Sequence, residues 1–141
     1  MINTKTIRDG IVSRLTGQTT AGSNVNSSRV LPYKVTNLPA ISVFTSSMNA
    51  ESISVITPAF KRTVDIGIEV IAAANTDWQD AVDDILFTCK TILFTDVTWT
   101  EQFQSIAGYT EEHDLDDSGE KPIAIGTLII SVEIVEPETF S

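Results

Sequence analysis

The sequence predicts an α+β fold, in which a mostly antiparallel sheet carries two helices packed on one face. Two adjacent segments lead to this prediction. Residues 60–72 alternate apolar and polar side chains, which is the pattern of a strand with one buried face. Residues 78–93 then place apolar side chains every three or four positions, the pattern of a helix with one buried side. We expect this strand and helix to fold back on each other, because that removes both apolar faces from water.

The composition is that of one globular domain. The 141 residues are 42% hydrophobic and 20% charged, so we expect residues 1–141 to form a single domain. The formal net charge of −10 argues against a nucleic-acid-binding protein, because binding phosphates needs clustered lysine and arginine. The sequence shows neither a signal peptide nor an apolar run of membrane-spanning length, so we expect a soluble, unexported protein without membrane contact.

The chain begins with a segment that predicts an amphipathic helix at residues 3–15. Ile7, Ile11 and Leu15 fall on one side of it, and Gly17 is placed to end it in the left-handed conformation. Residues 17–28 are small, polar and almost uncharged, and we expect a mobile loop there. A deletion of residues 18–27 should therefore leave the subunit folded.

The next segments predict two paired strands. Residues 29–33 are compatible with a short strand, and residues 40–45 predict a longer one with Ile41 and Val43 facing inward. Residues 46–59 are expected to form a long polar loop or an extended hairpin arm. Residues 60–72 then return antiparallel to the first long strand, with an inward face formed by Val64, Ile66, Ile68 and Val70.

The second predicted helix has a start signal and a broad apolar side. Thr76 is placed to cap it, with Gln79 three residues later in the capping-box position. Cys89 is the single cysteine and falls on the apolar side, where we expect it to pack as a small hydrophobic residue. The other members of that side are Trp78, Val82, Ile85, Leu86, Ile92 and Leu93.

The last third of the chain predicts a connector at residues 94–100 and two more strands. Residues 102–109 form the first, residues 111–121 an acidic turn, and residues 123–135 the closing strand. The inward face of the closing strand is Leu128, Ile130, Val132 and Ile134. Its other face also carries Ile125 and Ile129, which indicates that part of the sheet is covered on both sides, by another subunit.

No pattern in the sequence indicates catalysis. The chain has no glycine-rich phosphate loop, no nucleophile elbow and no cysteine–histidine metal motif, so we predict that it is not an enzyme. His113 is the only histidine, and we expect it to be a solvated loop residue. A small metal-dependent hydrolase that uses the acidic turn remains an alternative.

The acidic turn leaves three interpretations open. It is a solvated hairpin tip, which its charge favours, or Asp114, Asp116 and Asp117 bind a hard divalent cation through their oxygens. In the third interpretation its charges select a basic patch on a neighbouring subunit. The candidate interface residues are then Arg8, Arg14, Lys61 and Arg62 on the basic side, with Lys5 and Lys34 as further counter-charges, and Glu111, Asp114, Asp116, Asp117 and Glu120 on the acidic side.

Three segments in this order and spacing resemble a known family. They are IRDGIVSRL at 7–15, LPAISVFTSS at 38–47 leading to RTVDIGIEVIAA and DWQDAVDDIL, and the stretch from SIAGYTEEHDLDDSGEK to SVEIVE at 105–136. Together they are similar to the tail terminator proteins of long-tailed phages, the family of the lambda minor tail protein U. Residues 17–28 are longer and less distinctive here than the corresponding loop of that family.

The resemblance implies a structural protein of the virion that acts at the tail–neck junction and is assembled in the host cytoplasm. Six copies would form a ring that caps the tail tube protein, ends tail polymerisation and offers a surface to a head-completion or connector protein. DNA would pass through the lumen without specific binding. Magnesium assists assembly in the lambda relative, and Asp114, Asp116 and Asp117 match the region of its aspartate-rich turn; no other cofactor is implied. Another neck, tail-completion or head–tail connector protein is the alternative.

Overall fold

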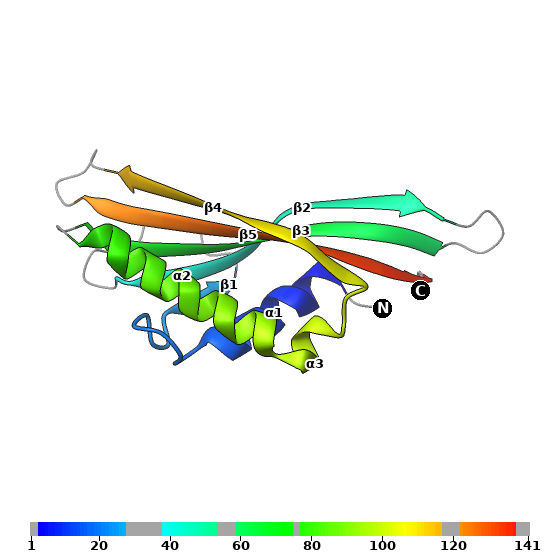
Figure 1. Ribbon diagram of the computed structural model, residues 1–141, viewed down its shortest axis with the longest axis horizontal. Helices are drawn as coiled ribbons and strands as arrows, with labels where there is room; N and C mark the ends of the chain where they lie inside the picture. The colour runs from blue at the N-terminus through cyan, green and yellow to red at the C-terminus, as the bar shows by residue number, and fades with distance from the viewer. Residues whose placement is uncertain (1–2, 28–37, 54–58, 75–76, 117–121, 138–141) are drawn as a thin grey trace.

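A five-stranded sheet organises the computed structural model, which describes residues 3–27, 38–53, 59–74, 77–116 and 122–137 (Figure 1). The strand order is β1-β2-β3-β5-β4, and only the β1–β2 pair is parallel. The three described helices all lie on one side of this sheet, so the predicted α+β class is confirmed. The elements are α1 Thr4–Leu15, β1 Val25–Ser27, β2 Ala40–Ser52, β3 Ala59–Ala73, α2 Trp78–Thr95, α3 Val97–Thr100, β4 Ser105–Asp116 and β5 Ile123–Pro137.

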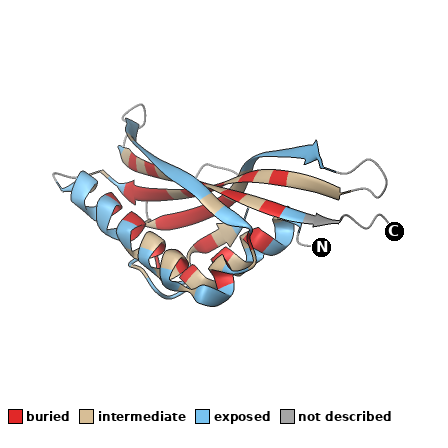
Figure 2. Cartoon of the chain, turned by 45° about the vertical axis from the view of Figure 1, so that its right-hand side comes forward, coloured by how far each residue is buried: buried red, intermediate tan, exposed pale blue. Residues whose placement is uncertain are grey.

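The hydrophobic core lies between the sheet and the two long helices. Strand β3 is central and pairs along its whole length with β5, for example Val64 with Val132 and Ile68 with Leu128. The predicted inward side chains of both strands are at most 2% exposed. Buried residues gather where the helices cross the sheet, as Figure 2 shows, because both amphipathic patterns point their apolar sides into the same layer.

The first helix follows the sequence prediction closely. Asn3 caps it, since its Oδ1 accepts a hydrogen bond of 2.8 Å from the backbone N–H of Thr6. Ile7, Ile11 and Leu15 are buried against the sheet, and Gly17 adopts φ +79° just after the helix. A side chain would be strained at that φ, so glycine suits the position.

The predicted loop at residues 17–28 is wrong for residues 25–27, whereas residues 17–24 form turns without a helix or strand. Residues 25–27 form β1, in which Val25 pairs parallel with Ile41 of β2. Val25 and Ala21 are each 7% exposed and belong to the core. Two isolated apolar residues in a polar segment have no period, so the local pattern could not predict this strand. A deletion of residues 18–27 would remove β1 and open the core.

The two alternatives for residues 46–59 are resolved in favour of the extended hairpin arm. Strand β2 continues through this segment to Ser52, which pairs with Phe60 of β3. A β-bulge falls between Thr45 and Ser47. Beyond the bulge β2 is exposed, and the arm projects past the helices (Figure 2). Residues 54–58 and the predicted short strand at 29–33 lie outside the described residues.

The acidic segment is a strand as far as the structure describes it, so the predicted turn is wrong for residues 111–116. Strand β4 runs on to Asp116, and Glu111 pairs with Leu128 of β5. This strand lies at the edge of the sheet, where charged side chains on either face still reach water. The sequence pattern therefore lacks the apolar alternation that would have predicted it. Asp117 and Glu120 lie outside the described residues.

The second helix begins one residue later than predicted, because a cap at Thr76 would place its first residue at 77. It starts at Trp78 with Asp77 at the N-cap position, and Thr76 lies outside the described residues. The predicted connector at 94–100 is mostly helical, because α2 extends to Thr95 and α3 follows. Asp96 separates the two helices and caps α3, its Oδ1 accepting a hydrogen bond of 3.1 Å from the Trp99 N–H.

Candidate functional site

The face of the sheet opposite the helices, called the second face below, carries two apolar rows across the strands. The cross-strand partners of the first row are Ala40, Ile71 and Ile125, and those of the second are Phe44, Gly67 and Ile129. Ala40 and Ile71 are completely buried, yet neither belongs to the core cluster on the helix side. Phe44, Ile125 and Ile129 are half-buried. No described helix packs on these rows, so the three half-buried side chains offer apolar surface to a partner.

Phe44 and Gly67 fit together within the second row. A Cβ atom placed on Gly67 would lie 2.2 Å from Cζ of Phe44, so the aromatic ring lies directly over the glycine. This arrangement shields the backbone of the central strand and leaves one side of the ring outward. The half-buried ring therefore contributes a flat apolar area to the second face.

Glu69 lies between the two apolar rows. Its neighbours across the sheet are Ser42 and Thr127. Burial raises the pKa of this carboxyl above its ordinary value of 4.5, because desolvation disfavours the charged form. A protein surface that covered the rows would remove more water and would raise the pKa of Glu69 further.

The second face becomes polar toward the hairpin arm. Asp65 accepts hydrogen bonds from the hydroxyls of Ser47 at 3.0 Å and Ser131 at 2.5 Å, which joins β2, β3 and β5 across the face. Closer to the arm, Lys61 Nζ lies 3.6 Å from Glu133 Oε1. The face thus divides into an apolar half and a hydrogen-bonded polar half.

The helix-side surface of β4 is joined to α2 by aromatic and charged contacts. The rings of Tyr109 and Phe94 are 5.7 Å apart, and Lys90 Nζ lies 5.0 Å from the Tyr109 ring centroid. Lys90 also forms an ion pair of 2.5 Å with Glu111. The hydrogen bond to Glu111 raises the pKa of Lys90, so this lysine stays charged.

His113 lies on β4 beside α2, and the prediction of a solvated loop residue is wrong. Its side chain is 20% exposed, and its Nε2 is 3.3 Å from Asp83 Oδ1. Its Nδ1 is buried and has no hydrogen-bond partner in the part of the chain that is described. The described neighbourhood brings no serine or cysteine nucleophile to this histidine, so its geometry fits an inter-element contact.

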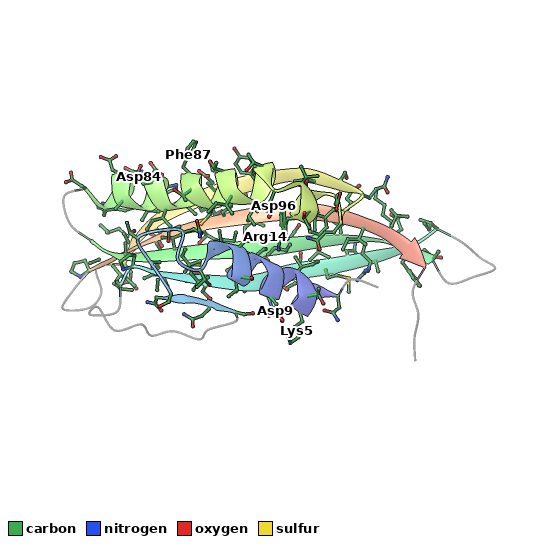
Figure 3. All side chains as sticks on the ribbon, turned by 90° about the horizontal axis from the view of Figure 1, so that it is seen from below. Lys5, Asp9, Arg14, Asp84, Phe87 and Asp96 are labelled. Atoms are coloured by element: carbon green, nitrogen blue, oxygen red, sulfur yellow. The ribbon has the colours of Figure 1, made fainter. Side chains whose placement is uncertain are left out.

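The basic interface candidates on α1 make contacts inside the subunit. Arg8 donates from Nη1 to Thr45 Oγ1 at 2.7 Å and from Nε to Ser27 Oγ at 3.3 Å, which ties α1 to β2 and β1. Arg14 forms an ion pair of 2.7 Å with Asp96 and donates to the Gly10 carbonyl (Figure 3). Arg8 therefore holds α1 to the sheet, and Arg14 holds α1 to the junction of α2 and α3.

The basic candidates on the arm differ in exposure. Lys61 is on the second face, and its side chain is 42% exposed beside Glu133. Arg62 is 5% exposed and lies on the opposite face, between Ala50 and Ile134 in the ladder. Lys61 is accessible to a partner, whereas Arg62 is buried within the subunit.

The acidic candidates are spread along the edge strand. Glu111 faces α2, whereas Asp114 and Asp116 alternate with it and lie on the second face. Asp114 Oδ1 accepts a hydrogen bond of 2.8 Å from the Leu115 N–H. The described residues contain no group of three or more histidine, cysteine, aspartate or glutamate side chains that could hold a metal ion. Asp117, the third candidate for a cation ligand, lies outside the described residues.

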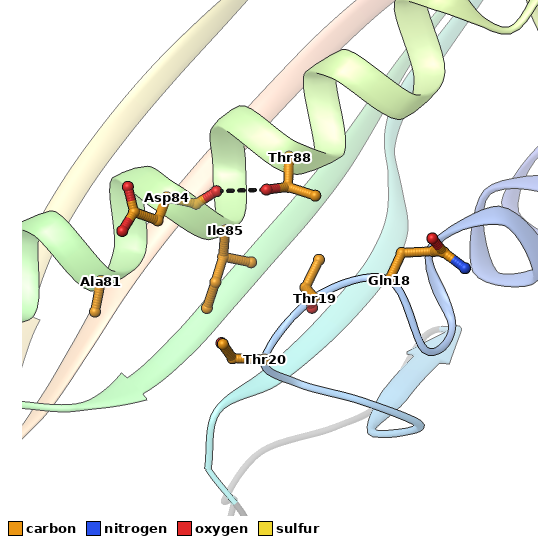
Figure 4. A pocket seen from close by; sticks show the side chains of 7 residues that line it. All are labelled: Gln18, Thr19, Thr20, Ala81, Asp84, Ile85 and Thr88. Atoms are coloured by element: carbon orange, nitrogen blue, oxygen red, sulfur yellow. Dashed lines mark hydrogen bonds between the residues drawn. The ribbon is translucent and has the colours of Figure 1, made fainter.

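A groove of about 470 Å³ separates the turn after α1 from α2 (Figure 4). Thr88 donates its hydroxyl to the Asp84 carbonyl at 2.9 Å, so that hydroxyl is used within the helix. The wall is a mixture of hydroxyl, amide, carboxylate and apolar groups. The lining residues are Gln18, Thr19, Thr20, Ala81, Asp84, Ile85 and Thr88.

Sequence reasoning missed the aromatic surface at the edge of the fold. Phe87 and Phe94 are seven positions apart on α2, and Tyr109 of β4 lies beside them. The spacing of the two phenylalanines places them on one side of a helix, and this signal was present in the sequence. Their proximity to Tyr109 depends on strand pairing and could not be read from the helix alone.

Acid should weaken the Arg14–Asp96 contact. Arg14 and the Trp99 N–H lower the pKa of Asp96 below 3.8, so this carboxylate stabilises the fold above about pH 4 and the contribution disappears as pH falls through the lowered value. Replacing Asp96 by Asn should lower Tm by a few degrees at pH 7, with the difference shrinking toward pH 2. Calorimetry across this range provides the measurement.

Asp9→Asn is the matched control. Its pair with Lys5 spans one helical turn, and the two side chains are 51% and 75% exposed. Such exposed pairs contribute little, so its Tm should stay close to that of the parent. Equal losses in both variants at pH 7 would contradict a specific role for Asp96.

Neither a protein-family model nor a curated protein matches this chain. In the described part of the chain, no helix is both long and apolar enough to span a membrane.

Proposed function

We propose that this protein is a structural subunit of the phage tail-terminator type, which assembles into a ring that caps a tail tube and presents a head-joining surface. The observation that carries the proposal is the second face. Phe44, Ile125 and Ile129 in its apolar rows are only half-buried, while the helices cover the other side of the same sheet. A second copy of the chain is the partner that this face favours.

A ring needs two unlike surfaces on each subunit, because head-to-tail contacts close only by rotation. The apolar rows of the second face supply one. The hairpin arm supplies the other, since Met48 of β2 and Ile53 just after it are 49% and 53% exposed there. These two surfaces lie toward opposite ends of the sheet. In the proposed ring the arm of one subunit covers the apolar rows of the next.

The charge distribution supports a passage for DNA that does not hold it. The formal net charge is −10, and exposed carboxylates stand on the second face at Glu112 and Asp114. A lumen lined by these carboxylates would repel DNA phosphates, and contact would release no counterions to favour binding. The proposed lumen therefore lets DNA slide through without specific binding.

Ile129→Lys tests the self-association directly. Ile129 points from β5 onto the second face, so a lysine there reaches water in the free subunit but would be buried in the ring. Losing one apolar anchor and burying a charge should weaken association by at least about 10- to 100-fold. Light scattering after size exclusion, over a range of concentrations and with and without magnesium, measures the mass.

Ser13→Lys makes the same charge change on the exposed side of α1, away from both proposed ring surfaces, and serves as the control. It should assemble like the parent, while both variants keep the parental circular dichroism spectrum. A parent protein that stays monomeric at high concentration, or an Ile129→Lys variant that assembles normally, would disprove the proposed interface.

The role in the tail is tested by removing the protein from the virus that encodes it. Loss of a terminator should give tail tubes of excessive and variable length, since nothing stops polymerisation. Another neck or connector protein would instead leave tails of normal length that fail to join heads. Electron microscopy of the particles distinguishes these outcomes.

A further inference from the structure

The outer edge of β4 is open along the described sheet. Its inner side pairs with β5 from Ser105 to Asp116, and no described strand pairs with its outer side. An edge strand of this kind presents alternate backbone N–H and C=O groups to which an extended segment can add. The twelve-residue strand is long enough to hold such a segment in a fixed register.

A pocket of about 260 Å³ lies beside this edge, on the helix side. Phe87 and Tyr109, which line it, are 67% and 50% exposed, and Phe87 projects from the outer side of α2 (Figure 3). Lys90 is held by Glu111 and Tyr109, which fixes the base of the pocket. The remaining lining residues are Thr91, Phe94 and Thr95. Exposed aromatic side chains around a small pocket suit an apolar anchor residue.

The opposite face of the same edge is acidic. Glu112 and Asp114 are exposed, point to the second face and are two residues apart, so they line one side of the strand. The described residues provide no lysine or arginine for either carboxylate. A strand added at this edge would place its side chains alternately over the aromatic pocket and over these carboxylates.

We propose that the β4 edge binds an extended segment of another protein in which apolar residues alternate with lysine or arginine. The apolar side chains occupy the pocket of Phe87, Phe94 and Tyr109. The basic side chains lie opposite Glu112 and Asp114. Backbone hydrogen bonds to β4 supply affinity, and the two sets of side chains fix the register.

A second copy of this chain fits the edge poorly. Pairing of β4 with another β4 would place carboxylates near carboxylates, and such like-charge contacts disfavour the pair. Pairing with β2 of another copy, in the part of β2 that β1 leaves free, would place Ser47, Asn49 and Glu51 on the second face. None of these side chains is a cation that could pair with Glu112 or Asp114. Charge complementarity therefore favours a basic partner, and this binding does not depend on ring formation.

A fluorescent nine-residue peptide that alternates valine and lysine, with phenylalanine at its centre, is the probe. Fluorescence anisotropy at about 0.15 M salt measures its binding to the full chain. The control peptide has the same composition with all lysines at one end. The alternating peptide should bind at least about 10-fold more tightly, because only it can satisfy both faces at once. Equal affinity, or no saturable binding of the alternating peptide, overturns the proposal.

Variants of the chain separate the site from general attraction to an acidic protein. Phe87→Ala, and the pair Glu112→Lys with Asp114→Lys, should each weaken binding at least about 10-fold. A peptide with glutamate in place of lysine should recover affinity for the charge-reversed pair. Asp80→Lys reverses a carboxylate charge on α2, away from β4, and should have little effect on peptide binding. A loss of affinity as large as that of the β4 variants would overturn the site.

Backbone methylation tests strand addition itself. Methyl groups on the amides of every second peptide residue block the hydrogen bonds along one edge of the peptide only. One methylation frame should abolish binding, while the other should leave it unchanged. Equal effects of the two frames overturn the strand geometry. Peptide binding by a protein that stays monomeric would support this site while contradicting the proposed ring.

Discussion

Replacing Trp99 with alanine is expected to lower the free energy of unfolding by about 3–5 kcal/mol. Trp99 is completely buried, and its ring meets Phe103 edge-on with centroids 5.0 Å apart. Removal of the indole would leave a cavity between α3 and the sheet. A domain of this size is stable by only about 5–15 kcal/mol, so a large share would be lost. Urea denaturation followed by circular dichroism measures the change.

Trp99→Phe should cost much less, roughly 1–2 kcal/mol. The indole Nε1 is buried and has no hydrogen-bond partner among the described residues. Phenylalanine loses part of the packing but also removes a donor that burial leaves unsatisfied. If both variants lost the same free energy, the packing explanation for Trp99 would be wrong.

Gly126→Ala is expected to destabilise the protein by about 2–3 kcal/mol, near the upper end for overpacking. A Cβ atom at Gly126 would lie 2.2 Å from Val82 Cγ1 and 3.1 Å from Leu86 Cδ1. Both neighbours are buried on α2, so neither side chain can swing away. The helix itself would have to move off β5. Chemical denaturation measures the loss of unfolding free energy. The comparison holds if the dependence of that free energy on denaturant concentration is the same for both proteins.

Gly67→Ala provides the matched comparison. Its Cβ would lie equally close to the Phe44 ring, at 2.2 Å, but that ring is half-buried on the second face and can rotate outward. The cost should stay below about 1 kcal/mol, since alanine also reduces the entropy of the unfolded chain. If Gly67→Ala lowered the unfolding free energy more than Gly126→Ala, the explanation that only the neighbours of Gly126 are unable to move would be wrong.

Prediction from the sequence succeeded where one element supplied its own pattern. The inward faces of β3 and β5, the apolar side of α2 and the burial of Cys89 all follow from local spacing. Burial raises the pKa of the Cys89 thiol to about 12, in agreement with a packing role. The second apolar face, inferred from Ile125 and Ile129, is also present, although its partner remains a proposal.

Prediction failed where the structure depends on pairing between distant segments. Residues 25–27 form a strand because they pair with β2, and residues 111–116 form one because they pair with β5. The sequence predicted Arg14 as a contact to another subunit. In the structure it pairs with Asp96 at 2.7 Å, although the two residues are 82 positions apart in the chain. Charge and polarity in the sequence indicated exposure and could not indicate these partners.

The sequence by itself determined which side chains of β3, β5, α1 and α2 leave water, because the periods of two and 3.6 residues fix the faces of strands and helices. The tertiary structure alone decided which strand forms the edge of the sheet and which aromatic residues meet beside it. Those features arise when β4 pairs with β5 under α2, and no local spacing encodes a contact between elements that the chain brings together only on folding.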